Sequence, residues 1–423
     1  MPQESTRQLV DHLFRHEYGK MVAILIKYFG ISHLEIVEDA VQEAFYKALK
    51  VWRFNSPPLQ PSAWLLQVAK NSLLDHVRQQ QNRQKHLDNL PVLNLSEIKE
   101  EEIYQEKELA DSQLRLIFAC CHPSLKKEDQ IALTLKTISG FSIKEIASAL
   151  LLHEETIKKR LQRARGSIIS QNLEMSIPLG AALSQRLEVV HTVLYLLFNE
   201  GYHALVADEV IRKELCAEAM RLTKLLIEHP TYQSTAANAL LSLMCFHAAR
   251  FESRIDVDQQ IILLSDQDRS RWNAQLIQLG HHYLNRATEE KTLSAYHLEA
   301  AIAAHHCMAP TFEATNWPAL LKLYTLLLQL KSTPIILLNK IVVLIQLKEL
   351  EEAFLFFNTL DEAHFSSRAY LYFAVGAELY TKRLEREKAK IYLKKAIVNT
   401  QSKSEKELLT LRLQNLVSQR PMQ

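Results

Sequence analysis

Apolar residues recur at helical spacing along almost the whole chain. Between residues 36 and 49 they fall three and four positions apart, with polar residues on the opposite side. This apolar stripe consists of Val37, Val41, Ala44, Phe45 and Ala48. Helices are also predicted at 113–121 and 127–138, and a helical pattern fills 183–415 with short breaks. The breaks are placed at Gly201, Pro230, Ser265, Pro310, Pro318 and Pro334. The pattern therefore predicts an all-α protein.

One stretch near the N-terminus cannot be helical. The segment 53–61 contains Pro57, Pro58 and Pro61, and proline is excluded from helix interiors because it lacks a donor and clashes with the preceding turn. Ser62 is predicted to cap the helix that follows, which runs through Trp64 to Arg78. The first helical unit is therefore interrupted by a proline-rich loop.

Composition along the chain indicates four segments. The first helical unit spans about 5–80 and the second 111–170. Between them, residues 81–110 are rich in Gln and then in Glu, with little apolar periodicity, which is typical of a linker. A large helical extension occupies 183–415.

The end of the extension carries a weak repeat. Its small and aromatic residues match the spacing of a tetratricopeptide helix pair, and Ala353 and Phe357 form a fainter copy 36 residues earlier. The matching positions are Ala377, Tyr380, Ala389, Leu393 and Ala396. The alternative is a helical domain without repeats.

The segment 142–165 reads as two short helices joined by a tight turn, the layout of a DNA-binding helix-turn-helix. Ile157, Leu161 and Ala164 form the apolar stripe of the second helix. Leu151 occupies the turn where a glycine often stands, which indicates a slightly different turn. The alternative is an ordinary surface helix with a solvated basic face.

The second helix has a dense basic surface. Its polar faces carry Thr156, Lys158, Lys159, Arg160, Gln162, Arg163 and Arg165. Lys158, Lys159 and Gln162 lie opposite the apolar stripe and could reach base edges. Arg160, Arg163 and Arg165 lie at the rims, where phosphates are found. Glu155 suits the helix N-terminus and could accept a hydrogen bond from a cytosine amino group.

Composition narrows the class of protein further. Only 8 of 423 residues are glycine, which leaves few β-turns, and the net charge of +2 means that basic character is local, at 76–85 and 158–165. Five cysteines without CxxC spacing suit a reducing cytoplasm. The N-terminus lacks an apolar signal core, and the most apolar stretch, 335–347, is too short to cross a membrane.

Candidate catalytic or metal chemistry is weak. His281–His282 and His305–His306 are adjacent pairs whose rings diverge by about 100° on a helix, so they are poorly placed to share one ion. No Gly-rich phosphate loop or Ser/His/Asp array stands out. The sequence predicts no metal, no cofactor and no enzyme. Ser265 with Asp268 looks like the start of a helix that holds Trp272.

Together these segments resemble the sigma-70 family. The motifs that carry the resemblance are DAVQEAF at 39–45, the proline-rich loop, WLLQVAKN at 64–71, the acidic linker and the helix-turn-helix. Motifs at 116–123, 194–202, 215–219, 265–272 and 300–306 resemble the extracytoplasmic-function (ECF) subgroup with a long tetratricopeptide-like extension.

The resemblance implies roles in the first unit. Asp39, Gln42 and Glu43 match residues that dock on the β′ clamp of core RNA polymerase. The loop 53–61 matches the segment that holds a flipped base of the minus-ten element, with Phe54 either a stacking platform or packed under the loop. Asn71 matches a base-reading position. Arg78, Arg83 and Lys85 would meet phosphates.

The resemblance also implies roles for the rest of the chain. The helix-turn-helix, with Lys158, Lys159 and Gln162, would read the minus-thirty-five element beside the β flap of the polymerase. The acidic linker would run near the RNA path. The extension would regulate the sigma domains in cis or bind a regulatory protein. The alternatives are a transcription activator with a helical-repeat sensor and a repeat scaffold with an incidental helix-turn-helix; only a sigma factor needs both 39–45 and 53–71.

Overall fold

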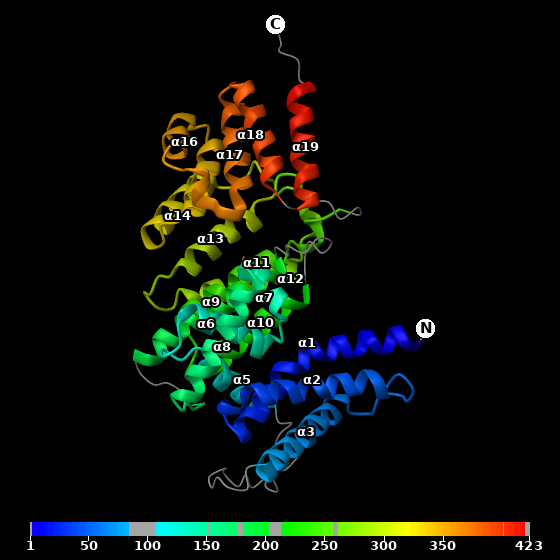
Figure 1. Ribbon diagram of the computed structural model, residues 1–423. Helices are drawn as coiled ribbons and strands as arrows, with labels where there is room; N and C mark the ends of the chain where they lie inside the picture. Colours follow the sequence, from blue (N-terminus) through cyan, green and yellow to red (C-terminus); the bar gives the residue numbers. More distant parts are fainter. Residues whose placement is uncertain are drawn as a thin grey trace. The chain divides into compact units, whose positions relative to one another are not determined.

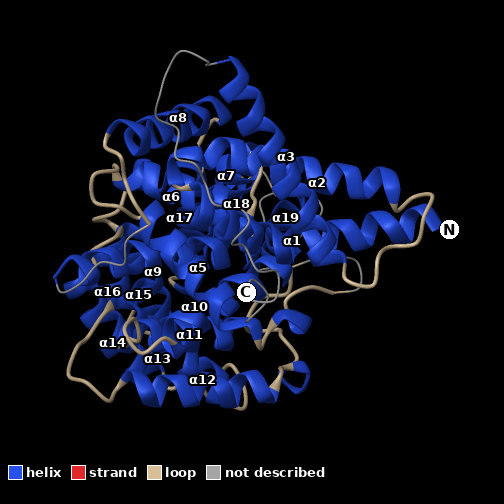
Figure 2. Cartoon of the chain, turned by 90° about the horizontal axis from the view of Figure 1, so that it is seen from below, coloured by secondary structure: helices blue, strands red, loops and turns tan. Residues whose placement is uncertain are grey.

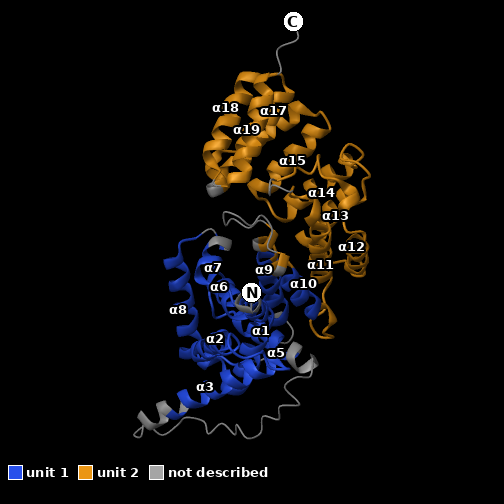
Figure 3. Cartoon of the chain, turned by 90° about the vertical axis from the view of Figure 1, so that its right-hand side faces the viewer, with its two compact units in different colours: residues 1–197, 217–226 blue, residues 198–216, 227–423 orange. Residues whose placement is uncertain are grey.

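The computed structural model describes residues 2–83, 106–150, 152–175, 181–202, 213–256, 261–400 and 402–418. The regular elements in these ranges are helices, apart from an isolated bridge between Ile255 and Ile261 (Figures 1 and 2). The chain forms two compact units, residues 1–197 with 217–226 and residues 198–216 with 227–423 (Figure 3). The predicted all-α class is confirmed.

Unit 1 contains the two predicted helical units and the first part of the extension. Its helices are α1 (Pro2–Phe29), η1 (Ile31–His33), α2 (Leu34–Val51), α3 (Pro61–Arg83), α5 (Glu106–Cys120), α6 (Lys127–Ser139), α7 (Ile143–Leu150) and α8 (Glu154–Ser170), followed by most of α9 (Ala181–Tyr202) and of α10 (Lys213–Glu228). The linker residues 84–105 lie outside the described part.

The core of unit 1 forms where the sequence pattern placed apolar side chains. The stripe of α2 is buried throughout, from Val37 to Ala48, and Cys120 and Cys121 at the end of α5 are buried too. Helix α1 packs against α6 at Gly19, where an added Cβ would lie 1.9 Å from the carbonyl oxygen of Ile138. The approach of α1 to α6 therefore requires glycine at this position.

Unit 2 contains the rest of the extension. Its helices are α11 (Thr235–Ala248), η3 (Phe251–Ser253), η4 (Arg269–Arg271), α12 (Ala274–Ala287), α13 (Ala295–Met308), α14 (Trp317–Leu330), α15 (Pro334–Gln346), α16 (Leu350–Phe357), η5 (Glu362–Arg368), α17 (Ala369–Lys382), α18 (Arg386–Asn399) and α19 (Lys403–Ser418). The positions of the suggested repeat all face one core, formed mainly by α15 to α19.

Close packing explains the small residues of that core. An added Cβ at Gly376 would meet Tyr392 at 2.5 Å and Phe357 at 2.6 Å. Phe357 also stacks on Tyr372, with ring centroids 4.7 Å apart. Helices α17 and α18 can therefore approach closely only because one of them presents a glycine.

Three local predictions are wrong. Ser62 does not cap α3, because the helix begins at Pro61, where proline fits the first turn. Gly201 does not break α9, which continues to Tyr202. Asp268 caps the short η4 by accepting from the backbone N–H of Ser270, and Trp272 follows η4 instead of lying within a helix. Helix α12 starts later, with Asn273 as its cap.

None of the helices in the described ranges is long and apolar enough to cross a membrane.

Candidate nucleic-acid and polymerase interface

The polar face of α2 is presented to solvent. Asp39 and Gln42 are exposed and Glu43 is half-buried. The Glu43 carboxylate accepts a hydrogen bond from the Ser72 hydroxyl of α3 and lies 2.9 Å from the Lys47 ammonium. These two contacts hold the pKa of the Glu43 carboxyl below its ordinary value. Glu43 therefore stays charged while it helps to fix α2 on α3.

The loop between α2 and α3 is anchored at its start by a buried tryptophan and carries an exposed aromatic residue further on. Trp52 is buried and packs on Trp64, with ring centroids 5.2 Å apart. Phe54, two residues further, is 82% exposed. The alternative in which Phe54 packs under the loop is therefore excluded, and its ring remains available for stacking.

Helix α3 continues the same surface with polar side chains. Asn71 is exposed, and its side-chain oxygen accepts a hydrogen bond from Gln67 at 3.2 Å. Arg78 is exposed about two turns further along the same face of α3, and its guanidinium lies 3.6 Å from the Asp75 carboxylate. The side chains of Arg83 and Lys85 lie outside what the structure describes.

Helices α7 and α8 form the predicted helix-turn-helix. A capping box begins α7: the Ser142 hydroxyl accepts from the backbone N–H of Glu145, whose carboxylate accepts from the N–H of Ser142. The stripe at Ile157, Leu161 and Ala164 is buried, as predicted. The capping box was missed in the sequence, although its Ser-x-x-Glu signal was present.

The face of α8 opposite that stripe is open to solvent. Lys158, Lys159 and Gln162 are exposed, and the Lys158 ammonium lies 2.5 Å from the carboxylate of Glu155. Thr156 is half-buried beside them. The side chains predicted to reach base edges are therefore brought together on one accessible surface.

Two of the three α8 arginines predicted to meet phosphates, Arg163 and Arg165, have carboxylate partners within the protein. Arg163 makes two hydrogen bonds to Asp129 of α6, at 2.8 and 3.2 Å. Arg165 donates to Glu35 and Glu38 of α2, and its side chain is 22% exposed. In this arrangement Arg165 joins the second helical unit to the first, and its guanidinium is occupied by two carboxylates.

Glu38 is the partner that sequence reasoning missed. It is 1% exposed, and its second oxygen accepts from the Thr137 hydroxyl of α6 at 2.8 Å. Burial raises the pKa of the Glu38 carboxyl, and the Arg165 guanidinium opposes that rise. Its position four residues after Leu34 places it on the apolar stripe of α2, which was a usable signal of burial.

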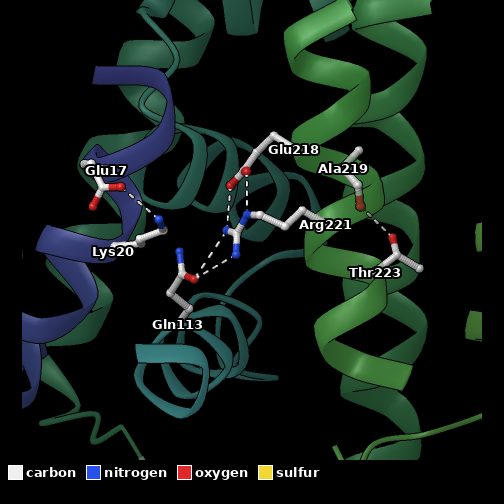
Figure 4. Close-up of polar contacts among 7 residues, drawn as sticks. All are labelled: Glu17, Lys20, Gln113, Glu218, Ala219, Arg221 and Thr223. Atoms are coloured by element: carbon white, nitrogen blue, oxygen red, sulfur yellow. Dashed lines mark hydrogen bonds and ion pairs between the residues drawn. The ribbon is translucent and has the colours of Figure 1, made fainter. Parts of the chain in front are cut away.

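The extension contacts the second helical unit inside unit 1. Arg221 of α10 binds the amide oxygen of Gln113 of α5 at 3.3 Å and pairs with Glu218 at 2.7 Å. Figure 4 shows these side chains facing Lys20 of α1. Arg186 of α9 donates to the backbone oxygen of Phe118 at 3.1 Å. The first helices of the extension therefore rest on α5.

Three family models match the chain. Residues 13–83 match sigma-70 region 2, residues 115–168 match sigma-70 region 4, and residues 186–288 match a family of unknown function, DUF6596. An uncharacterized protein of Rhizobium meliloti (strain 1021) is 35% identical over 321 residues, which cover 75% of each chain. No solved structure matches.

The chain therefore belongs to the sigma-70 family. Helices α1 to α3 contain its region 2, helices α5 to α8 contain its region 4, and a helical extension follows. These two regions imply a role in transcription initiation through core RNA polymerase and promoter DNA.

Proposed function

We propose that the chain is an ECF-type sigma factor that binds core RNA polymerase in the cytoplasm, directs promoter-specific initiation and has no enzymatic activity of its own. The observation that carries the proposal is that regions 2 and 4 occur in one chain, each with an accessible polar face. Asp39, Gln42 and Glu43 contact the β′ clamp, and region 4 lies at the β flap.

Two surfaces read the promoter. Lys158, Lys159 and Gln162 contact the bases of the minus-thirty-five element, with Glu155 and Thr156 beside them. In region 2 the exposed ring of Phe54 stacks on an unpaired base of the minus-ten element. Asn71 reads a base edge and Arg78 contacts phosphate.

Promoter binding requires the two regions to separate. The two elements lie about 25 base pairs apart, or roughly 85 Å of duplex at 3.4 Å per base pair. In unit 1, however, Arg165 of the reading helix is hydrogen-bonded to Glu38, next to the polymerase-binding face of α2. We infer that this contact belongs to a closed form, and that opening it also releases Arg165 to meet a phosphate.

The extension regulates this opening in cis. Helix α10 rests on α5 through Arg221 and Gln113, beside α1. Since α5 belongs to region 4, and Glu218, the ion-pair partner of Arg221, also interacts electrostatically with His16 on α1 of region 2, this contact stabilises the closed form. We expect Arg221→Ala to raise promoter-specific transcription, whereas Lys213→Ala, which removes an exposed ion pair of the same helix, leaves it unchanged.

The experiment that tests the proposal is in-vitro transcription with core polymerase and the full chain. Removing the whole extension would be a poor test, because Val190, Leu194 and Leu222 belong to the core of unit 1. Lys158→Ala with Lys159→Ala should weaken promoter use at least tenfold and relax the base preference at the minus-thirty-five element. Binding to core polymerase should be retained.

Lys144→Ala is the matched control, since it removes an exposed cation from α7 outside the reading face. No promoter-specific initiation by the full chain or by Arg221→Ala, under conditions where another sigma factor works, would overturn the proposal. DNA binding without any core-polymerase binding would favour the activator alternative.

A further inference from the structure

Two arginines of unit 2 gather on one indole ring. The guanidinium carbon of Arg269 lies 4.5 Å from the ring centroid of Trp272, and that of Arg250 lies 5.5 Å from it. Trp272 is buried, and both arginines are half-buried. The segment 265–272 and the end of α11 thus bring two positive charges to the same place.

The hydrogen bonds that these two arginines make to the protein do not use all of their N–H donors. Arg269 uses Nη1 to donate to the backbone oxygens of His306, at 2.6 Å, and Ala309, at 2.7 Å, which caps the end of α13. Arg250 uses Nε to donate to the Gln267 side chain at 3.1 Å. Its terminal nitrogens make no hydrogen bond to any residue that the structure describes.

Three buried nitrogen atoms around Arg269 have no hydrogen-bond partner. They are Nη2 of Arg269 itself, Nε1 of Trp272 and Nδ1 of His306. Buried polar atoms without a partner are rare and commonly mark the place of a bound water or ion. Since the arginine and indole atoms can only donate, the missing partner must accept hydrogen bonds.

The positive charge of this cluster also favours an anion as the missing hydrogen-bond partner. Within the described ranges no carboxylate lies at ion-pair distance from Arg250 or Arg269. Burial, together with these two guanidinium groups, lowers the pKa of His306 to about 4. The ends of α11 and α13 offset part of this charge, and Glu313 acts on Arg269 only from beyond ion-pair distance, so a net positive charge remains.

We propose that Arg250, Arg269, Trp272 and His306 bind a small phosphate-type anion. Guanidinium groups match the geometry of phosphate oxygens, and a tetrahedral anion can accept from several directions at once. Arg250 is the member that moves to admit the ligand, because its terminal nitrogens are not held by the protein. The site lies in the extension, and it goes beyond the role in initiation and does not depend on it.

Thermal unfolding of the full chain tests the site, with inorganic phosphate or adenosine monophosphate compared with sodium chloride at equal ionic strength. We expect either phosphate compound to raise the Tm by about 3–5 °C at ten times its dissociation constant. Tighter binding of the nucleotide would indicate a phosphate monoester as the ligand, and equal binding would indicate free phosphate. No rise with either compound overturns the proposal and leaves the arginines as helix caps.

Trp272→Phe is the sharpest variant, because it removes one N–H and keeps an aromatic ring. Its Tm without phosphate should be unchanged or higher, since a buried donor without a partner is lost. Its phosphate affinity should fall about fivefold to tenfold.

Arg250→Gln should lower the phosphate affinity at least tenfold. Arg271→Gln, an exposed arginine of the same segment, should leave it unchanged. If both Trp272→Phe and Arg250→Gln bind phosphate with wild-type affinity, the anion binds elsewhere and the proposal is wrong. If Arg250→Gln does not fold, the phosphate affinity of Trp272→Phe alone decides between these outcomes.

Discussion

Arg165 in unit 1 and Arg269 in unit 2 are both half-buried arginines that join distant segments, but their partners differ. Arg165 meets a buried carboxylate, Glu38, so its charge is neutralised inside the protein. Arg269 meets only backbone oxygens, and a second arginine lies nearby. A site that provides its own counter-charge works as a clamp between elements. A site that lacks one has a place for an anion from outside.

The largest expected effect comes from breaking the ion pair between Arg165 and Glu38, which clamps region 4 to region 2. Arg165→Met keeps the aliphatic stem but leaves Glu38 buried without its cation, which should lower the free energy of unfolding by about 3 kcal/mol at pH 7.5. The loss should be smaller at pH 5, because Glu38 can then take up a proton. Urea unfolding at the two pH values measures this, and an equal loss at both would contradict the clamp.

The corresponding change in unit 2 should cost less. Arg269→Met removes two hydrogen bonds to backbone oxygens but leaves no buried charge behind, so we expect a loss of about 1–2 kcal/mol. The loss should be the same at pH 5 and pH 7.5. The same urea titrations test it, and a cost above that of Arg165→Met would reverse the comparison.

A smaller effect is expected at the outer partner of Arg165. Glu35 also binds this arginine but is 68% exposed. Glu35→Ala should therefore change the free energy of unfolding by less than about 0.5 kcal/mol. A loss as large as that of Arg165→Met would show that the exposed pair, and not the buried one, holds the two regions together.

The smallest expected effect is the pH dependence that Glu38, paired with Arg165, gives to the free energy of unfolding. The pKa of Glu38 is raised in the folded protein, so above about pH 4.5 the folded state binds more protons at this group than the unfolded state. Stability should then fall as the pH rises through the folded pKa. Glu38→Gln cannot titrate and should lack this component. Identical slopes in the two proteins would show that Glu38 is not perturbed.

Much of region 2 and region 4 could be predicted because local signals define it. The stripe of α2, the prolines of 53–61 and the amphipathic pattern of α8 each depend on residues close in sequence. The errors at Ser62, Gly201 and Asp268 arose at helix ends, where a proline in the first turn or a short 3-10 turn can replace the expected cap.

The residues of the candidate site also fall into two groups, those whose placement local spacing predicts and those whose partners lie far away in the sequence. Lys158, Lys159 and Gln162 share a face because helical spacing alone puts them there. Arg163 and Arg165 carry the same charge on the same helix, yet they pair with carboxylates 34 and 127 residues away. Nothing near them in the sequence could indicate those partners.

The sequence by itself determined the helices, the faces they bury and the exposed polar face of α8, since these depend on spacing and side-chain type within a few turns. Only the tertiary structure decided that Glu38 lies inside, that region 4 joins region 2 through Arg165, and that Arg250 and Arg269 share one indole ring with no described carboxylate at ion-pair distance. Such features arise where segments far apart in the chain come into contact, and there the desolvation of each charge depends on neighbours that no local pattern specifies.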